Sequence, residues 1–299
     1  MPIVAVAGAT GRLGHLIVRA LLERGATVRA LIRPSTAPDK RLGLSGADIT
    51  EINYADPASL QQTLASAEIV VSALNGLRDI VVDTQTALLD AAVAAKVARF
   101  IPSDYAADLI KLELGENRNF DLRREFRARL LAAPIASTSI LVGGFMELLL
   151  RGRLLDAQAR QVNYWGSPDQ PLNYTTTPDT AQIAAAAALD PDAPPILRIV
   201  GDTVTAADIA AIATDIAGTP FSINHLGTID ELAGIIQQER TTHPEAENEI
   251  FPRFQQLQYT HNMQSGRGVL TPLDNARYGL KLTTVRDLLT ANAGQLRAS

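Results

Sequence analysis

Cysteine is absent from this 299-residue chain. Its absence excludes disulfide bonds, zinc sites built on thiolates and a cysteine nucleophile. It is typical of a protein kept in a reducing compartment, and we predict a cytoplasmic location. Lysine is scarce as well, because the chain has only Lys40, Lys96, Lys111 and Lys281 and draws most of its positive charge from arginine. The four histidines lack the spacing of metal ligands, so we predict no metal site.

Long apolar runs and an excess of positive charge are also missing. The apolar stretch from Ile183 to Leu189 is far shorter than the roughly 20 residues of a membrane-spanning helix. The first seven residues have no basic region and run into a glycine, so they read as a strand and not as a signal peptide. The net charge of −5 is unlike that of a nucleic-acid-binding domain. We therefore predict neither a membrane nor a nucleic acid as partner.

Short apolar segments alternate with helical patterns through the first half of the chain. The segments typical of buried strands lie at 3–7, 27–32, 49–54, 69–74, 99–102 and 139–142. Between them, Asp56-Pro57 predicts a helix start, because aspartate caps a helix and proline fits its first position. Repeated strand–helix–strand units predict an α/β fold whose parallel sheet has helices on both faces. After about residue 150 this rhythm changes, and Thr228 and Glu231 have the spacing of a capping box that opens a later helix.

The strongest motif is a glycine-rich turn that follows the first strand and opens the first helix. Gly8 allows a tight turn, Gly11 has no side chain where a pyrophosphate must approach, and Gly14 lets the helix pack closely on the strand. The helix N-terminus offers amide donors and a partial positive charge to phosphates. This arrangement predicts a Rossmann-type, doubly wound sheet that binds a dinucleotide. The turn residues expected to touch the cofactor are Gly8, Thr10, Gly11, Arg12, Leu13 and Gly14.

The end of the second strand decides between NAD and NADP. An NAD site has an acidic residue there that accepts hydrogen bonds from the ribose hydroxyls. This chain has Arg33 at that point, and a guanidinium can make a forked contact with a 2′-phosphate. Arg12 and Lys40 can add positive charge from either side. The sequence therefore predicts NADP(H) as the cofactor.

Other cofactor contacts are expected where later strands of the parallel sheet end, because those ends face the cofactor crevice. A glycine at 143 would let nicotinamide or substrate come close, and an aromatic ring at 145 can pack on a ring. The residues predicted on these grounds are Ser72, Ala73, Leu74, Ser103, Gly143 and Phe145.

The chain resembles the NmrA-like branch of atypical short-chain dehydrogenases, which includes isoflavone reductase-like and phenylcoumaran benzylic ether reductase-like enzymes. The matching segments are 8–14, 28–33, 99–105, 179–181 and 273–278. The resemblance implies an NADP(H)-binding Rossmann domain over residues 1–150. It also implies a smaller C-terminal α+β domain over residues 151–299 that mainly binds substrate, with some segments returning to the Rossmann sheet.

The departures from this family pattern concern the chemistry. Enzymes of this branch usually carry Pro-Ser-Glu-Phe-Gly, where this chain has Pro102-Ser103-Asp104-Tyr105-Ala106. They also carry a lysine assigned to proton transfer, and that position falls at or near Arg123. Arginine stays protonated, so it is a poor proton donor, although it can stabilise an oxyanion. Tyr105 is a candidate acid if a neighbouring arginine lowers the pKa of its phenol; otherwise it packs the cleft wall.

Two functions of different classes remain open at this point. The first is an NADP(H)-dependent reductase of a small aromatic, quinonoid, carbonyl or benzylic ether substrate, with Tyr105 and Arg123 as catalytic residues. The second is a non-catalytic NADP(H)-binding redox sensor that acts through a protein partner, because some members of the family lack the catalytic lysine. Either protein is expected to be a monomer or a homodimer.

Overall fold

The computed structural model describes residues 1–297 and has a six-stranded parallel sheet at its centre. In order across the sheet, the strands are β3 (Asp48–Glu51), β2 (Thr27–Ile32), β1 (Ile3–Ala7), β4 (Ile69–Ser72), β5 (Arg99–Ile101) and β6 (Ala136–Ser137). The order reverses between β1 and β4, and open α/β sheets bind their ligands outside the carboxyl ends of the strands at such a point. The predicted α/β class and Rossmann-type sheet are confirmed.

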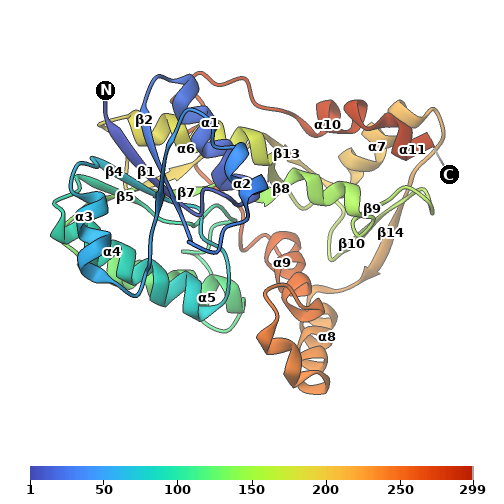
Figure 1. Cartoon of the computed structure of the whole chain (residues 1–299). Helices are drawn as coiled ribbons and strands as arrows, with labels where there is room; N and C mark the ends of the chain where they lie inside the picture. The colour runs from blue at the N-terminus through green and yellow to red at the C-terminus, as the bar shows by residue number, and fades with distance from the viewer. Residues whose placement is uncertain (298–299) are drawn as a thin grey trace.

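Helices cover both faces of the sheet, and β1 shows why its sequence is apolar throughout (Figure 1). Val4 and Val6 belong to one core cluster, whereas Ala5 and Ala7 belong to the cluster on the opposite face. All four are completely buried. The helices on the first face are α1 (Arg12–Glu23) and α6 (Thr177–Leu189). The helices on the second face are α3 (Pro57–Leu64), α4 (Gln85–Ala94) and α5 (Arg118–Ala132).

Helix starts follow the capping residues of the sequence. The Asp56 carboxylate accepts a hydrogen bond from the Ser59 amide (3.1 Å) at the start of α3. Thr228 and Glu231 form the predicted capping box of α8 (Ile229–Thr242). Among the short elements that were not predicted are α2 (Pro38–Leu42) and the π-helical turn η1 (Asp79–Thr84). The first of these matters for function, because α2 faces the N-terminal end of α1.

The second half of the chain builds a smaller α+β region. Its three-stranded sheets are β14-β10-β9 and β13-β11-β8. Their strands are β8 (Gly144–Phe145), β9 (Leu155–Asp156), β10 (Gln161–Trp165), β11 (Leu172–Thr175), β13 (Asp202–Val204) and β14 (Ser222–Gly227). The remaining helical elements are η2 (Met146–Arg151), α7 (Ala206–Ala217), η3 (Pro244–Asn248), α9 (Arg253–Gln264), α10 (Val285–Ala291) and α11 (Ala293–Arg297). Within residues 1–297, no helix is both long and apolar enough to cross a membrane.

Two segments of this second half lie against the first half. Helix α6 packs beside α1, as Figure 1 shows, and β12 (Ile196–Arg198) pairs in parallel with β7 (Ser139–Leu141). The expected strand at 139–142 therefore does not extend the six-stranded sheet. Its neighbour β6 forms the sheet edge, and the Thr138 amide between them still donates to the Phe100 carbonyl (3.2 Å). Residues 298 and 299 of the expected second domain lie outside the described residues.

Candidate functional site

The glycine-rich turn joins β1 to α1 at the carboxyl edge of the sheet. Gly8 has a φ of +74°, which side-chain-bearing residues rarely adopt, and a Cβ there would lie 2.7 Å from the Ala73 carbonyl oxygen. A Cβ on Gly14 would lie 2.1 Å from the Gly8 carbonyl oxygen. A Cβ on Gly11 would meet the same oxygen at 3.2 Å. Gly8 and Gly14 are thus required by backbone packing, whereas Gly11 leaves the outer side of the turn clear.

The first turn of α1 keeps its amide donors available. Gly11 is the N-cap residue and makes no side-chain cap, and the first turn contains no acidic residue. The first amides of a helix have no partner within the helix, so they bind a cap, water or an anion. Backbone amides at this end, together with the helix dipole, therefore favour a phosphate group.

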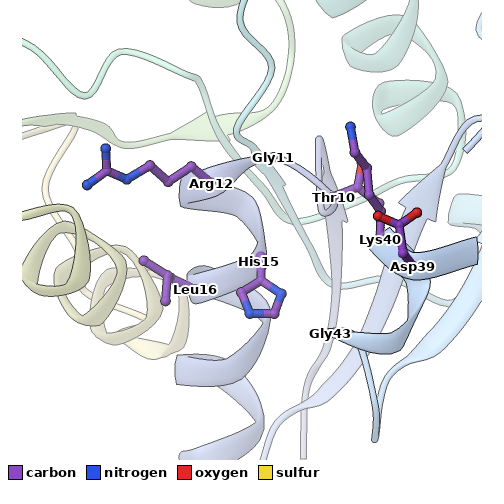
Figure 2. Close-up of a pocket in the computed structure, with 8 residues that line it drawn as sticks. All are labelled: Thr10, Gly11, Arg12, His15, Leu16, Asp39, Lys40 and Gly43. Carbon is purple, nitrogen blue, oxygen red and sulfur yellow. The ribbon is translucent and has the colours of Figure 1, made fainter. Parts of the chain in front are cut away.

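A pocket of about 380 Å³ opens beside this helix end, between α1 and α2 (Figure 2). Its lining residues are Thr10, Gly11, Arg12, His15, Leu16, Asp39, Lys40 and Gly43. Four residues predicted from sequence as cofactor contacts, Thr10, Gly11, Arg12 and Lys40, thus line one cavity. His15 and Asp39 were not predicted as pocket residues, although His15 follows Gly11 at the four-residue spacing that places residues on one helix face.

The two arginines expected to share this pocket lie in different surroundings. The guanidinium of Arg12 is paired with Glu147 of η2 at 3.2 Å, and Figure 2 shows its side chain directed away from Lys40. Arg33 is exposed beyond the end of β2, within electrostatic range of Tyr54. Burial raises the pKa of the Tyr54 phenol, and the positive charge of Arg33 opposes that rise. Arg12 is therefore directed away from Lys40, whereas Arg33 stays a predicted cofactor contact.

The segment after β4 supports the glycine turn. The Ala73 amide donates to the Ala7 carbonyl at 2.9 Å, and the Ala73 carbonyl lies against Gly8. Ser72 is fully buried. Leu74 packs with the core cluster on the α3–α5 face, whereas Leu13 packs on the α1–α6 face. Ala73 thus contacts the turn directly, whereas the two leucines pack against the cores on either side of the sheet.

Gly143 is explained by packing. It has a φ of +74°, and a Cβ there would lie 2.3 Å from the Asn173 carbonyl oxygen of β11. The expectation that this glycine makes room for nicotinamide or substrate therefore needs correction, because a strand of the protein fills that space. A cavity beside Gly143 measures only about 10 Å³, room for at most one water. Phe145 is partly buried against the same core cluster as Tyr105.

Tyr105 is buried, and its surroundings contradict the expected activation. Its side chain is 7% exposed and packs in the cluster that faces α1 and α6. The hydroxyl has no hydrogen-bond partner among residues 1–297. Burial, and to a lesser degree the charge of Asp104, raises the pKa of the Tyr105 phenol. The expected lowering of this pKa by an arginine was wrong, because the nearest strong charge is an aspartate.

Asp104 lies near α5, whereas Tyr105 packs toward α1 and α6. It is 2% exposed, and its Oδ2 atom has no partner in the described part of the chain. Burial raises the pKa of its carboxyl, although a hydrogen bond with Ser139 lowers it. The charges of Arg123 and Arg127 on α5 also lower it, without cancelling the effect of burial. Ionisation of this carboxyl is thus less favourable than that of an exposed aspartate.

Arg123 is held by backbone carbonyls. Its Nε donates to the Ser103 carbonyl (3.1 Å), and one terminal nitrogen donates to the Asn119 carbonyl (3.0 Å). The Ser103 amide in turn donates to the Gln85 side chain at 3.1 Å. The guanidinium is therefore fixed against the end of β5, next to the Ser103–Asp104–Tyr105 segment.

A buried amide cluster fixes the start of the helix that carries Arg123. Asn117 caps α5 through the Phe120 amide (3.1 Å), and its side chain also bonds Asn262 (2.9 Å) and Gln255 (2.8 Å) of α9. The amides of residues 118 and 119 donate to side-chain oxygens of Gln258 and Gln255. Helix α9 thus ties the C-terminal half of the chain to the first turn of α5.

Comparisons with known proteins agree with this architecture. A sequence model of the NmrA-like family matches residues 2–265. Probable pinoresinol-lariciresinol reductase 3 of Arabidopsis thaliana is 32% identical over 151 residues, which cover 49% of each chain. Pinoresinol reductase 1 of the same plant is 29% identical over 257 residues, which cover 79% of this chain and 81% of the relative.

Solved structures extend the likeness over the whole fold. An isoflavone reductase has a TM-score of 0.80 at 20% identity and covers 97% of this chain and 99% of its own. AtPrR2, solved with NADP+ and (+)-pinoresinol, has a TM-score of 0.79 at 21% identity and covers 97% of this chain and 98% of its own. At these identities the structures establish the fold. With the family model matching most of its length, the chain belongs to the NmrA-like family.

Proposed function

We propose that the protein is an NADP(H)-dependent reductase of a small aromatic, quinonoid, carbonyl or benzylic ether substrate. The observation that carries this proposal is the glycine turn, which leaves the α1 amides free beside a pocket lined by Lys40. The names of the relatives support it, since they are pinoresinol reductases and related reductases. We further propose that the protein is cytoplasmic. Residues 1–150 would bind the cofactor, and residues 151–299 would mainly bind the substrate.

The residues at the turn fit a dinucleotide. Its pyrophosphate would lie over Gly11, where no side chain intrudes and the helix amides are free. Lys40 would attract the 2′-phosphate from α2, and Arg33 would reach it from beyond β2. The bound cofactor would supply a hydride. All other chemistry then depends on groups of this chain.

Arg123 would stabilise negative charge on the substrate oxygen. Two backbone carbonyls fix its orientation, so little reorganisation is needed when that charge develops. Burial of Asp104 raises the pKa of its carboxyl and so disfavours a negative charge beside Arg123. An arginine in this role requires a separate proton source, because it does not give up its own proton.

Tyr105 remains the proposed proton source. Its hydroxyl keeps its proton at neutral pH, since burial raises the pKa of the phenol. The absence of a hydrogen-bond acceptor within residues 1–297 leaves that proton uncommitted. Transfer to an oxygen that Arg123 stabilises would leave a buried phenolate, so we expect proton return from water to follow each turnover.

The proposal is tested by NADPH oxidation with quinones, aryl aldehydes and benzylic ethers. Tyr105→Phe should lower kcat by about 10²–10⁴-fold while leaving the Kd of NADPH unchanged. Arg123→Lys should keep part of the activity and Arg123→Ala little, because a cation is what the oxyanion requires. Wild-type turnover by Tyr105→Phe would remove the tyrosine from the mechanism. A protein that binds NADPH but reduces no substrate of these classes would favour the redox sensor instead.

A further inference from the structure

His15 lies at the inner wall of the pocket between α1 and α2. Its backbone amide donates to the Gly11 carbonyl (3.0 Å), so it lies one helical turn beyond the N-cap. Figure 2 shows the imidazole ring directed into the space between the two helices, with Thr10, Asp39 and Lys40 on the opposite side. The ring therefore borders the same cavity as the free helix amides.

Gly43 fixes the place of this ring. A Cβ on Gly43 would lie 2.4 Å from Cε1 of His15 and 2.7 Å from its Nδ1. Any larger residue at position 43 would push the imidazole out of the gap between α1 and α2. The imidazole ring therefore packs directly against the backbone of Gly43, which forms one wall of the pocket.

The ring nitrogens of His15 are uncommitted within the part of the chain that the structure describes, since neither makes a hydrogen bond or ion pair there. An imidazole presents two donors when protonated and one donor and one acceptor when neutral. At a pocket wall beside helix amides, these nitrogens are available to a ligand.

The fixed charges around His15 nearly cancel. On α1, Arg12 is neutralised by Glu147 at 3.2 Å. On α2, Lys40 contributes a positive charge and Asp39 a negative one, and both line the pocket. An added positive charge on His15 would therefore strengthen the attraction for an anion that the α1 amides already exert. Histidine is the side chain whose ordinary titration falls between about pH 5 and 8.

We propose that His15 binds the 2′-phosphate of NADP(H) in its protonated form, opposite Lys40, and thereby sets a pH-dependent preference for NADP(H) over NAD(H). This inference rests on the proposed function, because it names a residue of the proposed cofactor site. Lys40 supplies a constant charge, whereas an imidazole supplies a positive charge only in its protonated form. The preference should thus be strongest in mildly acidic solution.

The phosphate has a titration of its own that the experiment must separate. A phosphate monoester gains its second charge near pH 6, so its attraction to Lys40 grows as the pH rises through that value. The contribution of His15 has the opposite sign. A comparison of the wild type with His15→Gln at each pH removes the phosphate effect, because both proteins meet the same ligand.

Calorimetric titration with NADP+ and NAD+ from pH 6.5 to 8.5 tests the proposal. In the wild type, the ratio of the NAD+ Kd to the NADP+ Kd should fall about tenfold across this range, the scale of one hydrogen bond to a charged group. His15→Gln should show the lower ratio throughout, with an unchanged Kd for NAD+. His243→Gln is the matched control, because His243 is an exposed residue whose ring pairs with Glu245 at 3.4 Å.

The outcomes separate this inference from the proposed function. A wild type that prefers NADP+ by the same ratio as His15→Gln at every pH overturns the role of His15 and leaves the reductase proposal intact. A wild type that binds neither dinucleotide overturns both. If His15→Gln does not fold, histidine ring resonances of the wild type at pH 6.5 give the answer. One of the four should shift with NADP+ and not with NAD+; equal responses to the two would refute the proposal.

Discussion

Adding one methyl group at Gly14 should destabilise the whole protein, whereas the same change at Gly234 should not. The Cβ of Gly14→Ala would lie 2.1 Å from the Gly8 carbonyl oxygen and 2.7 Å from its carbon, so β1 and α1 would have to separate. Overpacking of this kind costs about 1–3 kcal/mol, and more when both partners are backbone. Alanine would recover about 1 kcal/mol of helix propensity. We expect a net loss of about 2 kcal/mol, a fall in Tm of roughly 4 °C or more.

Two other glycine variants control this reasoning. A Cβ on Gly234, in α8, would meet no atom within 4 Å, so Gly234→Ala should raise stability by up to about 1 kcal/mol. Gly11→Ala would meet the Gly8 oxygen at 3.2 Å, so it should fold with little loss and yet weaken NADPH binding. Calorimetry gives the Tm of each variant, and titration gives the Kd of NADPH. A Gly14→Ala protein as stable as Gly234→Ala would refute the packing argument.

Three further changes have expected outcomes. Arg33→Ala should weaken NADP(H) by about 1.5–3 kcal/mol and hardly affect NAD(H), as judged by titration with both; equal losses would exclude a 2′-phosphate contact. Asn117→Ala should lower the free energy of unfolding in urea by about 2–3 kcal/mol, because it removes a helix cap and leaves the side chains of Gln255 and Asn262 without this hydrogen-bond partner. A loss below about 1 kcal/mol would contradict the role of the cluster. Asp104→Asn should flatten the pH dependence of stability. The raised pKa means that the folded protein keeps a proton that the unfolded chain loses above about pH 3.9, so wild-type stability falls as the pH rises toward the folded-state pKa. Parallel profiles for the two proteins would contradict this.

Local patterns in the sequence were enough to predict the sheet and the cofactor turn. Strand β1 is apolar on both faces because helices cover both, and Asp56 and Thr228 cap helices as expected. The edge of the sheet was harder to predict. Residues 136–141 form two short strands with different partners, and the second partner, β12, lies far along the chain. A local pattern identifies a strand but does not state which strand it will meet.

The same distinction applies to the candidate site. A glycine at position 143 suggested space for a ligand, but the space beside it is filled by Asn173 of β11. The amides at the start of α5 are satisfied by side chains of α9, which follow about 140 positions later. Asp104 and Tyr105 are adjacent in sequence, but Asp104 lies near Arg123 and Arg127 of α5, whereas Tyr105 packs in the core cluster that faces α1 and α6. Their electrostatic surroundings therefore differ, and a sequence motif does not predict that difference.

That separation across β5 gives the two neighbours different parts in the proposed chemistry. Asp104 lies on the α5 side, close to Arg123 and Arg127, where ionisation would neutralise the charge that an oxyanion requires. Its burial opposes ionisation and so preserves that charge. Tyr105 lies on the α1–α6 side with its hydroxyl unpartnered among residues 1–297. A family lysine can combine both duties in one ammonium group, as cation and as acid. Here the arginine can serve only as the cation, so the acid must be a different group. We propose Tyr105, whose hydroxyl keeps its proton and has no hydrogen-bond partner among residues 1–297.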